Sequence, residues 1–200
     1  MIRMFSRGAA LAILTLALCG CGSYPLPTLY VLGERAAPTP GVVSRTGLPV
    51  IELKTVTVPD DLDSTDIIRR EGANRAIASP TGQWKDRLSV AVTSALAADL
   101  RRRLPDVVVE TAGDSAPARR LVVDVESFEI GSDGVCSLTA RWSLAGPDAK
   151  AAPISEKGAF VETSSGTDDA VAAAMTSAID ELAARIAATI RKGSPANAAP

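Results

Sequence analysis

The first twenty residues determine how much of the chain is left to form a folded domain. Arg3 and Arg7 give a basic start, and residues 9–18 form an apolar run that only Thr15 interrupts. A basic start followed by such a run is typical of a secretory signal peptide. The run is about half as long as the roughly 20 residues that a membrane-spanning helix needs. We therefore expect residues 1–20 to be removed as a lipoprotein signal peptide, which leaves 180 of the 200 residues for one domain with short tails.

Cys21 directly follows this leader, and its flanking residues resemble the bacterial lipobox. Leu18 and Gly20 stand at positions −3 and −1. In that motif the cysteine thiol receives a diacylglycerol before cleavage, and the freed amine receives a third acyl chain. Cys19 fits worse because bulky Leu18 would precede it, and an ordinary cleaved signal with a cysteine by chance is the alternative. We expect an acylated tether over residues 21–28, because two or three acyl chains hold a protein on its membrane.

The composition narrows the class of function. The chain has no histidine, which excludes Ser/His/Asp triads and His-containing zinc sites. Carboxylate pairs, Ser/Lys dyads and all-oxygen Ca²⁺ sites stay open, but none has a recognisable spacing, and there is no phosphate-binding glycine loop. We expect neither an enzyme nor a cofactor or metal site. Without the two leader arginines the charge is 19 minus 23, or −4, with no basic cluster for nucleic acid.

Apolar periodicity predicts the order of the elements. A helix with a period of three to four residues is expected from Trp84, which opens it, to the run Arg101-Arg102-Arg103. That run complements the helix dipole or, alternatively, contacts anionic lipid. A second helix, capped by Thr167-Asp168-Asp169, carries an apolar stripe to Ile190. Alternation predicts strands at 29–32, 49–58, 67–70, 74–78, 107–111, 121–130, 135–144 and 157–163.

Two local features refine this reading. Gly72 lies between the strands 67–70 and 74–78 and predicts a hairpin turn. The pattern slips within 49–58, so this strand is either covered on both faces or re-phased by a bulge. We predict an α+β fold, a two-layer sandwich in which two helices cover one face of a mainly antiparallel sheet. This single domain spans 29–192, and residues 193–200 form a disordered tail.

Charged residues outside the predicted core are the candidates for contact with a partner. Asp60, Asp61 and Asp63 follow a strand-breaking proline and indicate a cation site, a partner contact or a solvated turn. Arg69 and Arg75 belong to the adjacent hairpin. Cys136 falls on the apolar face of a strand and is expected to be a small core residue without a disulfide partner.

An ordered set of motifs resembles the ABC-type transport auxiliary lipoproteins (PqiC-like). The set begins with the lipobox and Tyr30-Val31-Leu32. It continues with Val58-Pro59-Asp60-Asp61-Leu62-Asp63, Ile67-Ile68-Arg69-Arg70, Asn74-Arg75, and Trp84 four residues before Leu88. Asp61 departs from the pattern, because an aromatic residue is common at that position in the family.

The resemblance implies a non-enzymatic role beside an MCE-domain periplasmic protein and an ABC permease and ATPase that move lipids across the envelope. It also implies self-association into a ring. Gly22 is not the Asp that retains lipoproteins in the inner membrane, so the outer membrane, facing the periplasm, is the expected location. An assembly-factor or pilotin-like lipoprotein for an outer-membrane protein is the alternative, and neighbouring MCE and permease genes would discriminate between the two.

Overall fold

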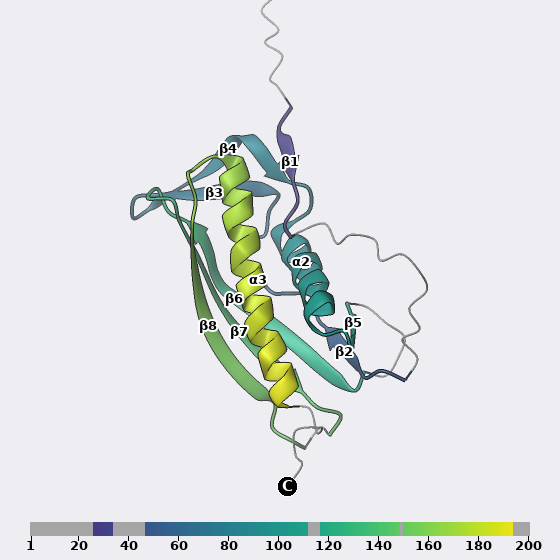
Figure 1. The fold of residues 1–200 in the computed structure, drawn as a ribbon. Helices are drawn as coiled ribbons and strands as arrows, with labels where there is room; N and C mark the ends of the chain where they lie inside the picture. The colour runs from purple at the N-terminus through teal and green to yellow at the C-terminus, as the bar shows by residue number, and fades with distance from the viewer. Residues whose placement is uncertain (1–25, 34–46, 112–116, 149, 194–200) are drawn as a thin grey trace, which may run out of the picture.

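The computed structural model describes residues 26–33, 47–111, 117–148 and 150–193. These ranges contain eight strands in two sheets, together with two helices (Figure 1). The elements are β1 (Thr28–Tyr30), β2 (Val50–Leu53), β3 (Asp66–Glu71), β4 (Arg75–Trp84), α2 (Leu88–Arg103), β5 (Val108–Glu110), β6 (Arg119–Ile130), β7 (Val135–Ala145), β8 (Ile154–Thr163) and α3 (Asp168–Lys192).

The larger sheet has five strands in the order β5-β2-β6-β7-β8. β2 runs parallel to both of its neighbours, whereas β6, β7 and β8 form an antiparallel meander. Both helices lie side by side over one face of this sheet (Figure 1). Alternation along β7 directs one set of side chains into the core, namely Cys136, Leu138, Ala140, Trp142 and Leu144. The predicted α+β class and its cover of two helices are confirmed.

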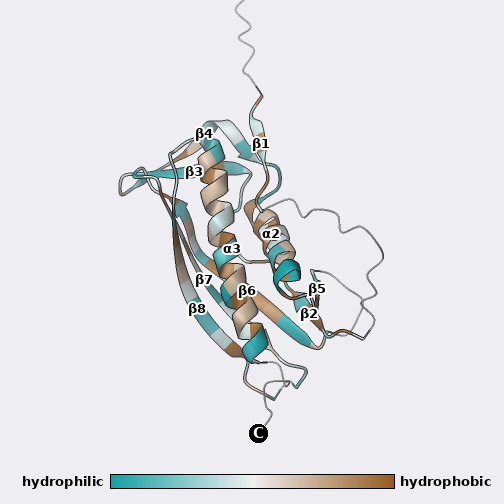
Figure 2. Ribbon diagram, in the orientation of Figure 1, coloured by the Kyte–Doolittle hydropathy of each residue, from teal (hydrophilic) through white to brown (hydrophobic). Residues whose placement is uncertain are grey.

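The start of α3 and the C-terminal ends of both helices are as the sequence predicts. Thr167 caps α3, because its Oγ1 accepts a hydrogen bond from the Ala170 amide at 3.2 Å. Both C-terminal ends are hydrophilic (Figure 2). In α2, the Arg101 Nε donates to the Val109 carbonyl at 2.9 Å, and Arg103 pairs with Asp180 of α3 at 2.6 Å. These arginines therefore tie the end of α2 to its neighbours. Within the part of the chain that the structure describes, no helix is long and apolar enough to cross a membrane.

The smaller sheet has three strands in the order β1-β4-β3 and lies at the end of the molecule where α3 begins (Figure 1). β3 and β4 form the predicted hairpin, with Gly72 at a φ of 64° in its turn. β1 pairs with β4 in parallel, and Tyr30 lies opposite Trp84. The strands thus divide into two sheets, where the sequence predicted one.

The start of the first helix was predicted wrongly. Trp84 is buried as expected, but it is the last residue of β4, and its amide donates to the Thr65 carbonyl at 2.7 Å. The helix begins at Leu88. The four-residue step from Trp84 to Leu88 fits a helix, but the pairing of Trp84 with Tyr30 in the small sheet prevails over it.

A bulge explains the slipped pattern at 49–58. The backbone amide of Lys54 donates to the Leu121 carbonyl, and that of Thr57 donates to the Val123 carbonyl. Three residue steps in this segment therefore match two residue steps along β6. The extra residue re-phases the strand, and Ile51, Leu53, Val56 and Val58 all become buried. At the other edge of the sheet, β8 begins at Ile154, earlier than position 157 where the alternation placed it.

Candidate interaction site on the three-stranded sheet

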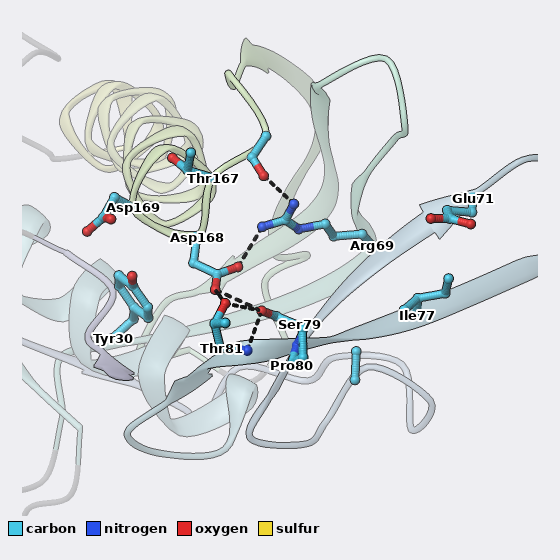
Figure 3. Close-up of a pocket in the computed structure, with 12 residues that line it drawn as sticks. Tyr30, Arg69, Glu71, Ile77, Ser79, Pro80, Thr81, Thr167, Asp168 and Asp169 are labelled. Carbon is cyan, nitrogen blue, oxygen red and sulfur yellow. Dashed lines mark hydrogen bonds and ion pairs between the residues drawn. The ribbon is translucent and has the colours of Figure 1, made fainter. Parts of the chain in front are cut away.

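A cleft of about 490 Å³ separates the small sheet from the first turn of α3 (Figure 3). Tyr30 of β1 and Arg69 of β3 project into it, together with Ser79 and Thr81 of β4. Asp168 closes the cleft from the helix side. Three segments that are distant in the sequence therefore meet here through polar side chains.

Asp168 is the centre of this network. One carboxylate oxygen accepts a hydrogen bond from the Arg69 guanidinium at 2.5 Å. The other accepts from the Ser79 and Thr81 hydroxyls, each at 2.7 Å. A second nitrogen of Arg69 donates to the Gly166 carbonyl, so the arginine also holds the loop before α3. The network attaches the hairpin to the start of the helix.

The electrostatics keep Asp168 ionised. Burial raises the pKa of this carboxyl. The hydrogen bonds from Thr81 and Ser79 and the ion pair with Arg69 lower the pKa by more than burial raises it, so the net pKa lies below its ordinary value. The residue is only 8% exposed, and its two carboxylate oxygens already accept three hydrogen bonds. Such a carboxylate fastens structure and is poorly placed to accept a proton from a substrate.

Gly82 allows β4 to approach this carboxylate closely. A Cβ atom at this position would lie 2.6 Å from Asp168 Oδ2 and 2.8 Å from the ring of Tyr30. The Tyr30 side chain also interacts with Asp169 in the first turn of α3. Partial burial, and then the charges of Asp169 and Asp168, raise the pKa of the Tyr30 phenol. β1 is thereby connected to the same helix start as the hairpin.

The predicted partner residues have different environments. Asp60 and Asp61 are exposed in their turn, and Asp61 lines a small hollow with Ile68 and Arg70 of the hairpin. Asp63 instead serves the start of α2, because its Oδ1 accepts from the Ser89 amide at 2.9 Å and its Oδ2 pairs with Arg87 at 2.9 Å. The hydrogen bond from Ser89 lowers the pKa of Asp63 below its ordinary value.

The two candidate arginines also separate. Arg69 points into the cleft, whereas Arg75 is exposed on the hairpin and pairs with Glu71 across it. The neighbouring Arg70 makes hydrogen bonds of 3.0 and 2.7 Å with Glu129 of β6. The turn at 60–63 and the outer side of the hairpin therefore form one exposed, charged surface, which we call the hairpin surface.

The two cysteines of the expected mature chain also differ. Cys21, the predicted lipidation site, lies outside the described residues. Cys136 is buried in the core, where burial, followed by the charge of Glu162, raises the pKa of its thiol to about 12. Among the residues that the structure describes, no three His, Cys, Asp or Glu side chains are placed to hold a metal ion.

Sequence reasoning missed the cleft. Asp168 was expected as a helix-start acid, which it is, but its partner Arg69 lies 99 residues away along the chain. Ser79 and Thr81 carried no signal beyond strand propensity. The alternation of Ser79, Thr81 and Gln83 with less polar neighbours is the one pattern that could have indicated a polar face on β4.

Comparisons with known proteins agree with this architecture. The model of a protein family described as "ABC-type transport auxiliary lipoprotein component" matches residues 30–187. A solved structure of an uncharacterized protein is similar with a TM-score of 0.68 and 17% identity, over 82% of this chain and 99% of that one. Protein XCC0632 from Xanthomonas campestris is similar with a TM-score of 0.63 and 17% identity, over 84% and 99%. The search of curated proteins found no match.

Proposed function

Because this chain belongs to the family of ABC-type transport auxiliary lipoprotein components, we propose that it is a non-enzymatic docking lipoprotein of an envelope transport system. Acylated Cys21 holds it on the outer membrane, facing the periplasm. There it binds an MCE-domain protein that works with an ABC permease and ATPase to move lipids. The observation that carries this proposal is the family match over residues 30–187.

The hairpin surface is the proposed contact with the MCE-domain partner. It consists of the turn with exposed Asp60 and Asp61 and of the outer side of the hairpin with Arg75. The other two predicted contact residues, Asp63 and Arg69, flank this surface and are engaged with the start of α2 and with Asp168. Ala76, Ile77 and Ala78 along β4 are exposed, so this part of the strand contributes no buried side chain to the core. Exposed charged residues that the core does not require favour a role in recognition.

The first strand after the proposed anchor belongs to the same small sheet as the contact surface. β1 begins seven residues after Cys21, at Thr28, and pairs with β4 of the hairpin. Anchoring confines the hairpin surface to one leaflet, which raises its effective concentration toward a partner that reaches the same membrane. We also propose that several copies associate into a ring, and light scattering of the purified acylated protein would measure the number of copies.

Charge reversal tests the contact. We choose Asp60→Lys with Asp61→Lys and leave Asp63 intact, because Asp63 holds the start of α2. A matched control is Asp106→Lys with Glu181→Lys, which makes the same charge change at two exposed positions elsewhere. The tagged proteins are purified from membranes, and co-purifying proteins are identified by mass spectrometry.

The proposal expects the hairpin variant to lose the MCE-domain protein while the control retains it. Circular dichroism and melting temperature are expected to match the unchanged protein in both cases. Retention by both variants would move the interface away from the hairpin surface. Failure of the unchanged protein to retain any MCE-domain protein would contradict the transport role and favour an assembly-factor or pilotin-like lipoprotein.

A further inference from the structure

Three large apolar side chains are exposed within six residues at the start of the described chain. Leu26 is 93% exposed, Leu29 61% and Val31 63%. Elsewhere among the described residues, the large exposed hydrophobic side chains are scattered. They are Ile77 in β4, Val90 in α2, and Ile154 and Val161, seven positions apart in β8. We call Leu26, Leu29 and Val31 the aliphatic edge.

The fold does not require these side chains to be apolar. β1 is an edge strand of the small sheet, and its alternation directs Leu29 and Val31 away from the core. Tyr30 and Leu32, which point the other way, are half-buried and buried. Leu29 lies opposite Gln83, so its cross-strand neighbour is polar. Serine or threonine at Leu29 and Val31 would suit an exposed strand edge better, which leaves their apolar character unexplained by packing.

The position of the aliphatic edge along the chain favours one occupant. Five residue steps separate Cys21 from Leu26, and an extended chain covers at most about 18 Å in that distance. If Cys21 carries acyl chains, Leu26 is thus always within a short reach of the membrane surface. Aliphatic side chains beside a lipid anchor add apolar area that the interface of the bilayer can take up.

A second copy of the chain fits this surface less well. A stable protein interface covers about 800 Å² on each partner, and a three-residue strand with its flanks offers only a fraction of that area. The Lys85 side chain is exposed, and its backbone amide donates to the Tyr30 carbonyl at 2.8 Å, so a cation stands beside the edge. An ammonium group next to aliphatic side chains suits the phosphate headgroups of a monolayer.

We infer that the aliphatic edge inserts into the headgroup region of the monolayer that holds acylated Cys21, and that it orients the domain. This inference rests on the proposed acylation. The β1 edge of the small sheet then faces the membrane, β3 lies at the opposite edge of that sheet, and α3 leads away from the membrane. The 25 residues of α3 cover about 37 Å, so Ile154, which packs beside Gly193 at the far end of the helix, stands well clear of the lipid.

Fluorescence quenching by brominated lipid tests this orientation. Leu29→Trp and Val31→Trp place an indole on the aliphatic edge, and Ile154→Trp is the control at the far end. The native Trp84 and Trp142 are buried and give the same background in every variant. Each full-length protein is purified from membranes and its acylation is verified by intact mass. It is then reconstituted into phosphatidylethanolamine and phosphatidylglycerol vesicles with or without bromine near the ester end of the acyl chains.

We expect bromine to cause a loss of the fluorescence added at positions 29 and 31, with emission shifted to shorter wavelength, and no change at position 154. Equal emission with and without bromine at 29 and 31 in acylated protein would overturn this inference and leave the proposed docking function intact. Emission at shorter wavelength that bromine does not quench, and that returns to longer wavelength on dilution of the protein in the vesicles, would overturn the inference and assign the edge to a second copy. A mass without acyl chains would overturn the proposed anchor and this inference with it.

Discussion

The five-stranded sheet and the three-stranded sheet depend to different degrees on the apolar core and on polar contacts. Under α2 and α3, the large sheet buries a continuous apolar core, in which Leu138 and Trp142 of β7 are almost inaccessible. The small sheet contributes Ile67 and Trp84 to that core, and polar contacts fasten its edges, Arg69 with Asp168 and Arg70 with Glu129. Its hairpin is largely exposed. The large layer is therefore a scaffold, whereas the small sheet carries the surfaces available for recognition.

The two sheets therefore differ in how strongly core packing constrains the size and polarity of their side chains. Along β7, a change of volume is felt by every neighbour in the core. Along β4, most side chains up to Thr81 are exposed, and only Gly82 and Trp84 are buried. Substitutions in the two sheets should accordingly differ in what they damage: stability in the large sheet and binding in the small one.

The largest expected effect lies in the large layer. Trp142 is 1% exposed, and its Nε1 donates to Thr189 Oγ1 at 3.3 Å. Trp142→Ala is expected to lower the free energy of unfolding by about 3–5 kcal/mol, out of a typical total of about 5–15 kcal/mol. Urea unfolding followed by circular dichroism measures this loss. The matched change on the small sheet, Ile77→Ala, should cost less than about 1 kcal/mol because Ile77 is 39% exposed.

Trp84→Ala tests the joint between the two layers. The side chain is 2% exposed at the end of β4, and we expect a loss in the same range of about 3–5 kcal/mol. Unchanged thermal unfolding together with a complete loss of partner binding would instead make Trp84 an interface residue.

A smaller effect is expected from Asp168→Ala. This change removes the acceptor of Arg69, Ser79 and Thr81 and leaves a guanidinium without its ion pair. An unsatisfied buried group costs about 1–3 kcal/mol. Hydrogen exchange should accelerate in β3 and β4 and remain slow in β7. Equal acceleration in both sheets would show that the layers unfold as one unit.

The carboxylates at the starts of the helices should differ from Asp99 of α2 in their response to pH. The pKa values of Asp168 and Asp63 are lower in the folded protein, so their stabilisation is full above the unfolded pKa of about 3.9 and is lost as pH falls through the folded values. Asp99 of α2 behaves oppositely: burial raises its pKa despite the contact with Arg102. Its contribution is present at low pH and is lost as pH rises through the raised pKa.

Two single substitutions separate these responses. Asp168→Asn should flatten the fall of stability on the acid side, below about pH 4. Asp99→Asn should remove the loss of stability that accompanies a rise in pH above about 4. Melting temperatures measured across this range check both, and an unchanged acid profile for Asp168→Asn would contradict the role given to its carboxylate.

The smallest effect on stability is expected at the hairpin surface. Asp60→Lys with Asp61→Lys alters two exposed side chains and should change the free energy of unfolding by no more than about 0.5 kcal/mol per site. A large loss of stability in this variant would mean that the turn supports the fold, and the contrast between the two layers would then be wrong at this point.

The parts of the fold that the sequence predicted are those with local causes. The alternation of β7, the Thr167 cap and the turn at Gly72 each depend on neighbouring residues, and the structure confirms them. Trp84 was misplaced because its strand is completed by β1, which lies far upstream. The cleft was missed for the same reason, since the contact between Arg69 and Asp168 joins positions 99 residues apart.

The most direct measurement of the central claim is hydrogen exchange of the purified complex with its MCE-domain partner. The division into scaffold and recognition surface predicts that partner binding slows exchange in the turn at 60–63 and in β3 and β4. The exposed face of β6, β7 and β8 should be unchanged. Protection confined to that face of the large sheet, with the hairpin unaffected, would contradict the claim.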